Sequence, residues 1–416
     1  MSGSQAEASG LVPEEHAATL EPANASSVKY NFALGYLRTF VVVLVLAGHS
    51  IVAYIPLVPP PATSLRAQPR AWEAIPVVDS QRWTGFSVLY GFGDTCVMSL
   101  MFFLSGLFVW NSLKRKGSGA FLRDRFLRLG LPFVVVAALV APLAYYPAYL
   151  QTGANPSLAA YGREWLSLGE WPDEPLWFIW VLLAFDCLAA LCFRVMPRSI
   201  KAPARVWREA LPGPAASFAL LVAVTAAAYI PLLHVFGPLA CARLGPFFIQ
   251  TSRLLHYAVY FAAGIIVGAY GIERGWLAPG GKLARRWPAW TLGALAAFCP
   301  VVIAIILLTT SRISLRTWET IGGFAFVLSC AVSGFAFLSI FLRFARARGK
   351  VFDSLRRNAY GMYLIHIVFV TWLQYVLLRA PLSPVAKGSI VFLGTLAVSW
   401  GAVAALRRLP AVARVI

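Results

Sequence analysis

Two residues of the first apolar stretch, Arg38 and His49, have side chains that can do chemistry. They stand eleven positions apart, and in a helix this spacing ends about 20° past three full turns with a rise of about 16 Å, so both project from one face. The imidazole, with an unperturbed pKa of about 6.5, can take a proton from a hydroxyl, and a guanidinium can stabilise an oxyanion. The spacing also fits an Arg38 that reaches lipid headgroups and a His49 that is only an interfacial polar residue.

A basic segment after the second apolar stretch contains Arg123, Arg125 and Arg128. Arg125 and Arg128 are three residues apart, which places them on one face of a helix. Guanidinium groups bind phosphate through two parallel hydrogen bonds, so these arginines are candidates for holding a phosphorylated donor such as coenzyme A. The competing interpretation is a loop from Lys114 to Arg128 whose charges orient the chain and contact anionic lipid.

Three further titratable residues lie within or at the end of apolar stretches: Asp94, Asp186 and His366. Asp94 stands at a depth similar to that of His49 and is a candidate to orient it, because a carboxylate can hold the tautomer of a histidine. Asp186 lies deep in the fourth stretch and is a candidate partner for one of the buried bases. His366 is expected to face the interior and to be hydrogen-bonded, in a structural or a catalytic role.

Histidine and tryptophan residues near the ends of the stretches favour interfacial roles. His234 and His256 lie near outer ends, where wet surroundings are expected. Tryptophans around the start of the fourth stretch fit the aromatic belt of a membrane interface, although such rings can also stack on a sugar. These are Trp171, Trp177 and Trp180.

The composition indicates a membrane protein. Of 416 residues, 59% are hydrophobic and 13% are charged, whereas about a quarter of a soluble chain is charged. The apolar residues come in blocks of about twenty, the length that crosses a hydrocarbon layer. The net charge of +19 occupies short segments between these blocks, which argues against nucleic acid as a partner. No cysteine or histidine spacing suggests a metal site.

We predict an all-α fold, a polytopic integral membrane protein with about ten transmembrane helices. Each span must be helical because every backbone polar group in lipid needs a partner within its own segment. The predicted spans are Asn31–Tyr54, Tyr90–Asn111, Leu129–Tyr149, Pro175–Arg194, Pro214–His234, Arg253–Gly271, Pro288–Thr309, Thr320–Leu342, Arg357–Leu378 and Lys387–Leu406.

Lysine and arginine are distributed unequally between the two sides of these spans, with 25 on one side and ten on the other. Basic loops stay in the cytoplasm, so the richer side, with both termini, is predicted to be cytoplasmic. Residues 1–30 are small and polar and predict a disordered tail that does not resemble a signal peptide. A membrane-embedded domain over residues 31–407 and a short cytoplasmic tail over 408–416 complete the predicted organisation.

Several segments, in this order along the chain, resemble the acyltransferase 3 family of membrane-bound acyltransferases. The arginine–histidine spacing in the first stretch matches a signature of that family, and Met101–Phe133 is similar to its second span, basic segment and third span. Glu174–Asp186 and Ala359–Leu378 also resemble the family. Their LWFIWVLL and YGMYLIHIVFVTWLQY sequences are closest to the glucan biosynthesis protein C branch, which succinylates periplasmic glucans. The resemblance covers residues 31–407.

The resemblance implies an enzyme of the bacterial inner membrane. It would move an acyl group, acetyl or succinyl, from a cytoplasmic acyl-CoA donor to a hydroxyl of an extracytoplasmic glycan or similar acceptor. His49 would be the acyl-transfer histidine, Arg38 its companion, and Arg125 and Arg128 the basic motif at the cytoplasmic end of the third span. The alternative is a transporter or flippase for a glycan or lipid-linked precursor, with the same intramembrane charges along its path.

Overall fold

The computed structural model describes residues 21–416 apart from 57–58, 69, 170, 173–175, 196–212, 272–275 and 279. In this part of the chain, ten helices are long and apolar enough to cross a membrane, which confirms the predicted all-α membrane fold. Residues 1–20 of the predicted tail and the predicted start of the fourth span at Pro175 lie outside the described residues.

The first half of the chain contains α1 (Glu21–Ile51), η1 (Val52–Tyr54), η2 (Ala71–Glu73), α2 (Thr84–Gly106), α3 (Val109–Arg125), the π-helical turn η3 (Phe126–Gly130), α4 (Leu131–Val135), a second π-helical turn η4 (Val136–Val140), α5 (Ala141–Gln151), α6 (Leu158–Leu166) and α7 (Trp177–Val195). The second half contains α9 (Pro214–Phe236), β1 (Cys241–Leu244), β2 (Phe247–Gln250), η6 (Thr251–Arg253), α10 (Leu254–Tyr270), α11 (Lys282–Arg285), α12 (Trp287–Thr309), α13 (Leu315–Phe344), α14 (Lys350–Leu377), α15 (Pro384–Leu406) and α16 (Pro410–Val415).

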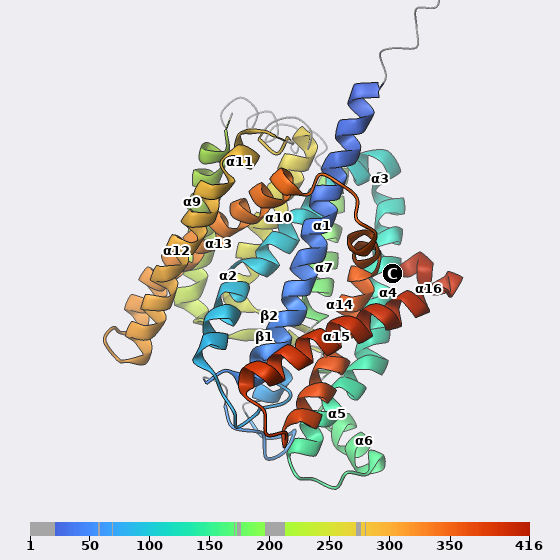
Figure 1. Ribbon diagram of the computed structural model, residues 1–416, viewed down its shortest axis with the longest axis vertical. Coiled ribbons are helices and arrows are strands. Elements are labelled where there is room, and N and C mark those ends of the chain that lie inside the picture. The colour runs from blue at the N-terminus through green and yellow to red at the C-terminus, as the bar shows by residue number, and fades with distance from the viewer. Residues whose placement is uncertain are drawn as a thin grey trace, which may run out of the picture.

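Helix α1 runs through the middle of the bundle and packs against α2, α13, α14 and α15 (Figure 1). The apolar part of α13 is 72% buried, whereas that of α12 is only 17% buried, so α13 is an inner helix and α12 exposes most of its surface to lipid. We call the end of the bundle where α1 begins the basic end. The opposite end, where α1 ends and the β1–β2 hairpin lies, is the hairpin end (Figure 1).

The segment from Lys114 to Arg128 is helical, so its prediction as a loop is wrong. It belongs to α3 and η3, which continue through α4, η4 and α5 as one helical stretch, Val109–Gln151. The chain kinks at Gly117, whose φ of 76° and ψ of 165° are accessible to glycine. The arginines of this segment therefore project from a helix, which holds their side chains in set directions.

Helices α2 and α10 cross in close backbone contact. A Cβ at Gly106 of α2 would lie 2.2 Å from the carbonyl oxygen of Phe261, and one at Gly264 of α10 would lie 2.2 Å from that of Phe103. A Cβ at Gly268 would meet the oxygen of Leu107 at 2.0 Å. Small residues four apart allow such contact between membrane helices, where apolar burial supplies little drive for association. This crossing fixes the end of α2 that faces α1.

We expect Gly264→Ala to lower the free energy of unfolding by about 2 kcal/mol, because its methyl group forces two backbones apart. Gly334→Ala is the matched control, because a Cβ there meets nothing within 4 Å. It should leave the stability unchanged or raise it by up to about 1 kcal/mol through helix propensity. Thermal unfolding of both variants in detergent measures the difference, and equal midpoints would contradict the close crossing.

In the described residues, the segment between η1 and α2 contacts both α15 and the segment that follows α5 at the hairpin end. The ammonium of Lys387 on α15 lies 2.8 Å from a carboxylate oxygen of Asp79, and both side chains are fully buried. The side chain of Gln151 bonds both to the amide of Val78 at 3.0 Å and to its carbonyl at 2.6 Å. The short β1–β2 hairpin, which the hydropathy pattern did not predict, joins this layer through an ion pair between Arg243 and Glu73.

Candidate functional site

His49 stands in the last turn of α1, at the hairpin end, and faces a second histidine. The ring of His366, on α14, lies 5.2 Å from the ring of His49, measured between centroids. His366 is fully buried, as its central place in an apolar stretch predicts. Two imidazoles that are far apart in the sequence therefore meet where α1 packs against α14.

The hydrogen bonding of His366 determines its tautomer. Its Nδ1 lies 2.7 Å from the carbonyl oxygen of Tyr363, which can only accept a hydrogen bond, so Nδ1 carries the proton. Nε2 then has a lone pair, and this atom is buried without a hydrogen-bond partner among the described residues. An unsatisfied buried acceptor is costly in free energy, which makes this nitrogen a candidate to receive a proton or a hydrogen bond during a reaction.

A glutamine that the sequence analysis missed holds the backbone of His49. The side-chain amide of Gln374 on α14 donates to the carbonyl of His49 at 2.9 Å and to that of Ser50 at 3.3 Å. These carbonyls belong to the last turn of α1, where intrahelical partners run out. Gln374 is buried, with 1% of its surface exposed. A buried amide within a span is costly in itself, and this signal would have found it in the sequence.

Arg38 packs against the end of α2. Its guanidinium donates to the carbonyl of Leu104 at 3.4 Å and lies 5.6 Å from the ring centroid of Phe108. These residues belong to the end of α2 and the turn that follows it. The side chain keeps an exposed surface while resting on these neighbours.

Arg125 and Asp186 form an ion pair between α3 and α7. The Nε atom of Arg125 lies 3.1 Å from a carboxylate oxygen of Asp186, which is fully buried. Arg125 also stacks on Phe121, at 4.9 Å from the ring centroid, and lies close enough to Arg38 for the two charges to repel. Two guanidiniums and one carboxylate leave an excess positive charge here, which favours binding of an anion.

Arg123 and Arg128 differ from Arg125 in the exposure of their side chains. Both are exposed, whereas Arg125 is partly buried against Asp186. The π-helical turn η3 begins directly after Arg125, and its i to i+5 hydrogen bonds change the angular spacing of a regular helix. The expectation that Arg125 and Arg128 share one face assumed a regular α-helix, and η3 departs from that geometry. Of the predicted phosphate-binding arginines, Arg125 is the one that joins Arg38.

Asp94 pairs with Arg253 rather than with His49. Its two carboxylate oxygens accept hydrogen bonds from the guanidinium at 2.7 Å and 2.6 Å. This bidentate pair links α2 to the start of α10. Depth along the membrane normal could not tell which neighbour Asp94 faces. In this structure the residue supports the helix packing.

The wet interfacial position expected for His256 is wrong. The residue is fully buried, and its Nε2 lies 2.8 Å from the hydroxyl of Ser99. It is surrounded by aromatic rings of α9, α10 and α13, including Tyr229, Tyr260 and Phe326. His256 lies on the inward face of α10, and this face determines its environment more than its position near the end of the helix does.

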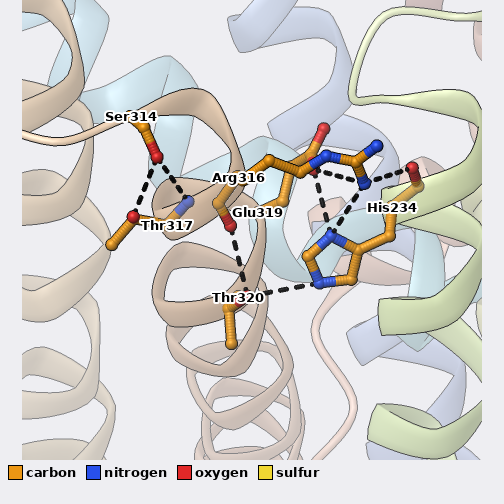
Figure 2. Close-up of polar contacts among 6 residues, drawn as sticks. All are labelled: His234, Ser314, Arg316, Thr317, Glu319 and Thr320. Carbon is orange, nitrogen blue, oxygen red and sulfur yellow. Dashed lines mark hydrogen bonds and ion pairs between the residues drawn. The ribbon is translucent and has the colours of Figure 1, made fainter.

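His234 stands near the end of α9 and keeps 30% of its side chain exposed. Its Nδ1 lies 3.0 Å from a carboxylate oxygen of Glu319, its Nε2 lies 3.2 Å from the hydroxyl of Thr320, and its carbonyl accepts from Arg316 at 2.9 Å. Figure 2 shows these contacts tying α9 to the first turns of α13, where Ser314 caps the helix. The cluster secures two helix ends and lies apart from the residues that face His49.

The three tryptophans differ in their surroundings. Trp171 is half exposed, Trp177 packs on Tyr257 at 5.2 Å between centroids, and Trp180 donates to the carbonyl of Phe248 at 3.0 Å. Trp177 and Trp180 thus pack against α10 and β2.

The site so assembled has a histidine pair near the hairpin end and an excess positive charge nearer the basic end of the same helix. A comparison with protein families matches residues 31–404 to the model of an acyltransferase domain, that of the acyltransferase 3 family. No curated protein and no solved structure matches the chain. The match spans all ten membrane helices apart from the last two residues of α15, so the chain belongs to the acyltransferase 3 family and is a multi-pass membrane acyltransferase.

Proposed function

We propose that the protein transfers an acyl group, acetyl or succinyl, from an acyl-CoA to a hydroxyl of a glycan or similar acceptor on the other side of the membrane. The proposal places the basic end in the cytoplasm and the hairpin end outside, in the plasma membrane of a bacterium. What supports it is the position of Arg38 and His49 about 16 Å apart along α1, with Arg125 of α3 close to Arg38 and His366 of α14 beside His49.

The donor's phosphates bind at the basic end, where Arg38 and Arg125 supply the excess positive charge. An acyl-CoA carries its thioester at the end of a long flexible arm, so the acyl group extends along α1 toward the hairpin end. Arg38 and Arg125 lie on different helices, α1 and α3, and a bound phosphate reduces their mutual repulsion. The acceptor enters from the hairpin end.

At the histidine pair, His49 acts as the general base. It takes the proton of the acceptor hydroxyl as the oxygen attacks the thioester carbonyl, and a new C–O bond forms. The C–S bond then breaks, and the leaving thiolate of coenzyme A receives the proton from the imidazolium. The ring of His366 lies 5.2 Å from that of His49, and the lone pair on its Nε2 stabilises the positive charge that His49 carries in between. The step needs no oxidant and no further co-reactant.

Gln374 is expected to position His49 in this step. Gln374→Leu removes both hydrogen bonds to the end of α1 and should lower kcat about 10- to 100-fold with little change in the donor KM, because a small misplacement of a catalytic group is costly. Asn358→Leu is the matched control, since Asn358 is a buried amide of the same helix that bonds to the carbonyl of Ser354 at 2.9 Å, near the basic end. Equal kcat values for the two variants would contradict the positioning role.

Inverted and right-side-out membrane vesicles from the native cells test the proposal. Acyl-CoA labelled in the acyl group is added outside both kinds of vesicle, and release of the coenzyme A thiol and label in the glycan are measured. Inverted vesicles, which expose the cytoplasmic side, should release the thiol and label the glycan in their lumen. Release from right-side-out vesicles alone would overturn the orientation. Movement of glycan without thiol release would identify a transporter instead.

A further inference from the structure

Two arginines at the basic end, Arg348 and Arg356, lie on the ring of one residue of α1. The guanidinium carbon of Arg348 is 4.5 Å from the ring centroid of Phe32, and that of Arg356 is 5.5 Å from it. Phe32 is buried, with 7% of its surface exposed. Arg348 belongs to the connection between α13 and α14, and Arg356 to the second turn of α14. The buried ring therefore holds two positive charges close together where three elements meet.

These two guanidiniums have hydrogen-bond donors to spare. The Nε atom of Arg356 is buried and has no hydrogen-bond partner among the described residues. The carboxylate of Asp353 lies 3.7 Å from another nitrogen of Arg356, and it accepts a hydrogen bond from the hydroxyl of Tyr36 at 2.8 Å. Arg348 forms no ion pair with the described part of the chain. Between positions 343 and 357 the sequence has six lysines and arginines against one acidic residue, so positive charge is in excess here.

Arg356 lies beside the row of α1 residues that leads to Arg38. A Cβ at Gly35 would lie 2.8 Å from Cδ of Arg356. Phe32, Gly35 and Arg38 are three positions apart in turn, and residues at this spacing form one row on the surface of a helix. The rise from Phe32 to Arg38 is about 9 Å. The arginines on Phe32 therefore lie near Arg38 along α1, on the side of the basic end.

The same face of α14 also reaches the helical segment that carries Arg125. Tyr360 follows Arg356 by four positions, which places both on one face of α14. The hydroxyl of Tyr360 donates to the carbonyl of Arg128 in η3, and η3 begins directly after Arg125. Arg356 thus belongs to the part of α14 that contacts both α1, which carries Arg38, and the turn that follows Arg125. These side chains are accessible, since Arg356 keeps 36% of its side chain exposed.

We infer that Arg348 and Arg356 bind the 3′-phosphate on the ribose of the donor's coenzyme A. The inference rests on the proposed acyl transfer and adds a second phosphate site, one that recognises the carrier of the acyl group. Coenzyme A has two anionic parts, the diphosphate next to the adenosine and the phosphate monoester at the 3′ position of the ribose. Arg38 and Arg125 hold the diphosphate, and the arm with the thioester then extends along α1 toward His49.

The charge of the 3′-phosphate suits this pair of arginines. A phosphate monoester carries a charge of about −1.5 to −2 and has three strong acceptor oxygens. Guanidiniums bind such oxygens through two parallel hydrogen bonds. Two guanidiniums on one ring repel each other, and an anion bound between them offsets the repulsion. A carrier without the monoester, such as an acyl carrier protein, cannot make these contacts, so the site selects free coenzyme A thioesters as donors.

Equilibrium binding of coenzyme A and of 3′-dephospho-coenzyme A to the purified full chain in phosphatidylcholine nanodiscs tests the inference. The two probes differ in the 3′-phosphate alone. The Kd for coenzyme A is expected to be about 10- to 100-fold below that for 3′-dephospho-coenzyme A. Arg348→Gln and Arg356→Gln should each lower this ratio about 3- to 10-fold, by raising the Kd for coenzyme A and leaving that for the other probe unchanged.

Arg346→Gln is the matched control, because Arg346 is an exposed arginine of the same connection, two positions from Arg348. It removes the same charge from the basic end and should leave the ratio of Kd values within about 2-fold, since salt screens exposed charges. Thermal unfolding shows that each variant is folded. Arg348 is exposed, so its replacement leaves no buried group without a partner.

Each other result has a definite meaning. Equal Kd values for the two probes overturn the inference and leave the proposed function standing, because both probes bind. A ratio that persists in both variants places the 3′-phosphate elsewhere, and an equal loss in Arg346→Gln assigns it to the overall charge; both overturn the inference. Loss of the ratio in nanodiscs that contain phosphatidylglycerol overturns it as well, because lipid headgroups then occupy the arginines. If neither probe binds, the proposed function fails and the inference falls with it.

Discussion

His49→Ala is expected to lower the rate of acyl transfer about 10²- to 10⁴-fold, which is the range that a general base contributes. The variant removes the imidazole that α1 places at the hairpin end, while the packing of α1 on α2, α13, α14 and α15 remains. The measurement is thiol release from acyl-CoA in vesicles that contain equal amounts of folded protein. Thermal unfolding in detergent should show a midpoint close to that of the unchanged chain.

Two further variants make this result specific. His234→Ala removes a histidine of the same end that bonds to Glu319 and Thr320, outside the site, and it should retain most of the activity. His366→Ala should lower the rate less than His49→Ala, since His366 assists the imidazolium of its partner and does not touch the acceptor. If His366→Ala abolished transfer and His49→Ala did not, the roles of the two histidines would be reversed. A His49→Ala variant with the full rate would remove the imidazole from the mechanism.

Replacing Arg125 is expected to affect both stability and donor binding, and the structure allows the two effects to be separated. Arg125→Gln leaves Asp186 as a fully buried carboxylate without its partner, which should lower the free energy of unfolding by about 3 kcal/mol or more. The double variant Arg125→Gln with Asp186→Asn replaces both charges by amides of similar shape. It should recover most of the lost stability, because neither buried charge remains.

The double variant should nevertheless bind the donor poorly. It lacks one of the two guanidiniums of the anion site, and we expect its KM for acyl-CoA to rise about 10- to 100-fold, the equivalent of one or two charge-assisted hydrogen bonds. Arg123→Gln is the matched control, because Arg123 lies on the same helix but is exposed. A donor KM that is unchanged in the double variant would show that Arg125 serves the fold and not the donor.

Features that repeat along a single segment could be predicted from the sequence. The blocks of apolar residues predicted ten membrane helices, and the structure has ten candidates. The first, fourth, fifth, sixth and seventh lie within two residues of the predicted bounds, whereas α2 lies five to six residues earlier than predicted and α13 and α14 begin five and seven residues earlier. The spacing of Arg38 and His49 placed both on one helix, and the burial of His366 followed from its central position in an apolar stretch. The family also followed from the order of these segments. All of these depend on the geometry of one helix or on the thickness of the bilayer.

Contacts between helices could not be predicted in the same way. Hydropathy gives the depth of Asp94 in the membrane, but its partner, Arg253, is decided by which faces of α2 and α10 meet, and that crossing depends on glycines at Gly106, Gly264 and Gly268. The π-helical turn after Arg125 likewise alters the direction of Arg128, which a regular helical period cannot reveal.

The sequence by itself determined that this protein is a membrane acyltransferase with a histidine and an arginine on its first helix. Each of these properties depends on the residues of one continuous segment. The tertiary structure alone decided that His366 and Gln374 meet His49, that Asp186 pairs with Arg125, and that Lys387 is neutralised by Asp79. The reason is that in lipid the choice of neighbour rests on close packing and on the pairing of buried polar groups between helices, and both depend on segments far apart in the chain.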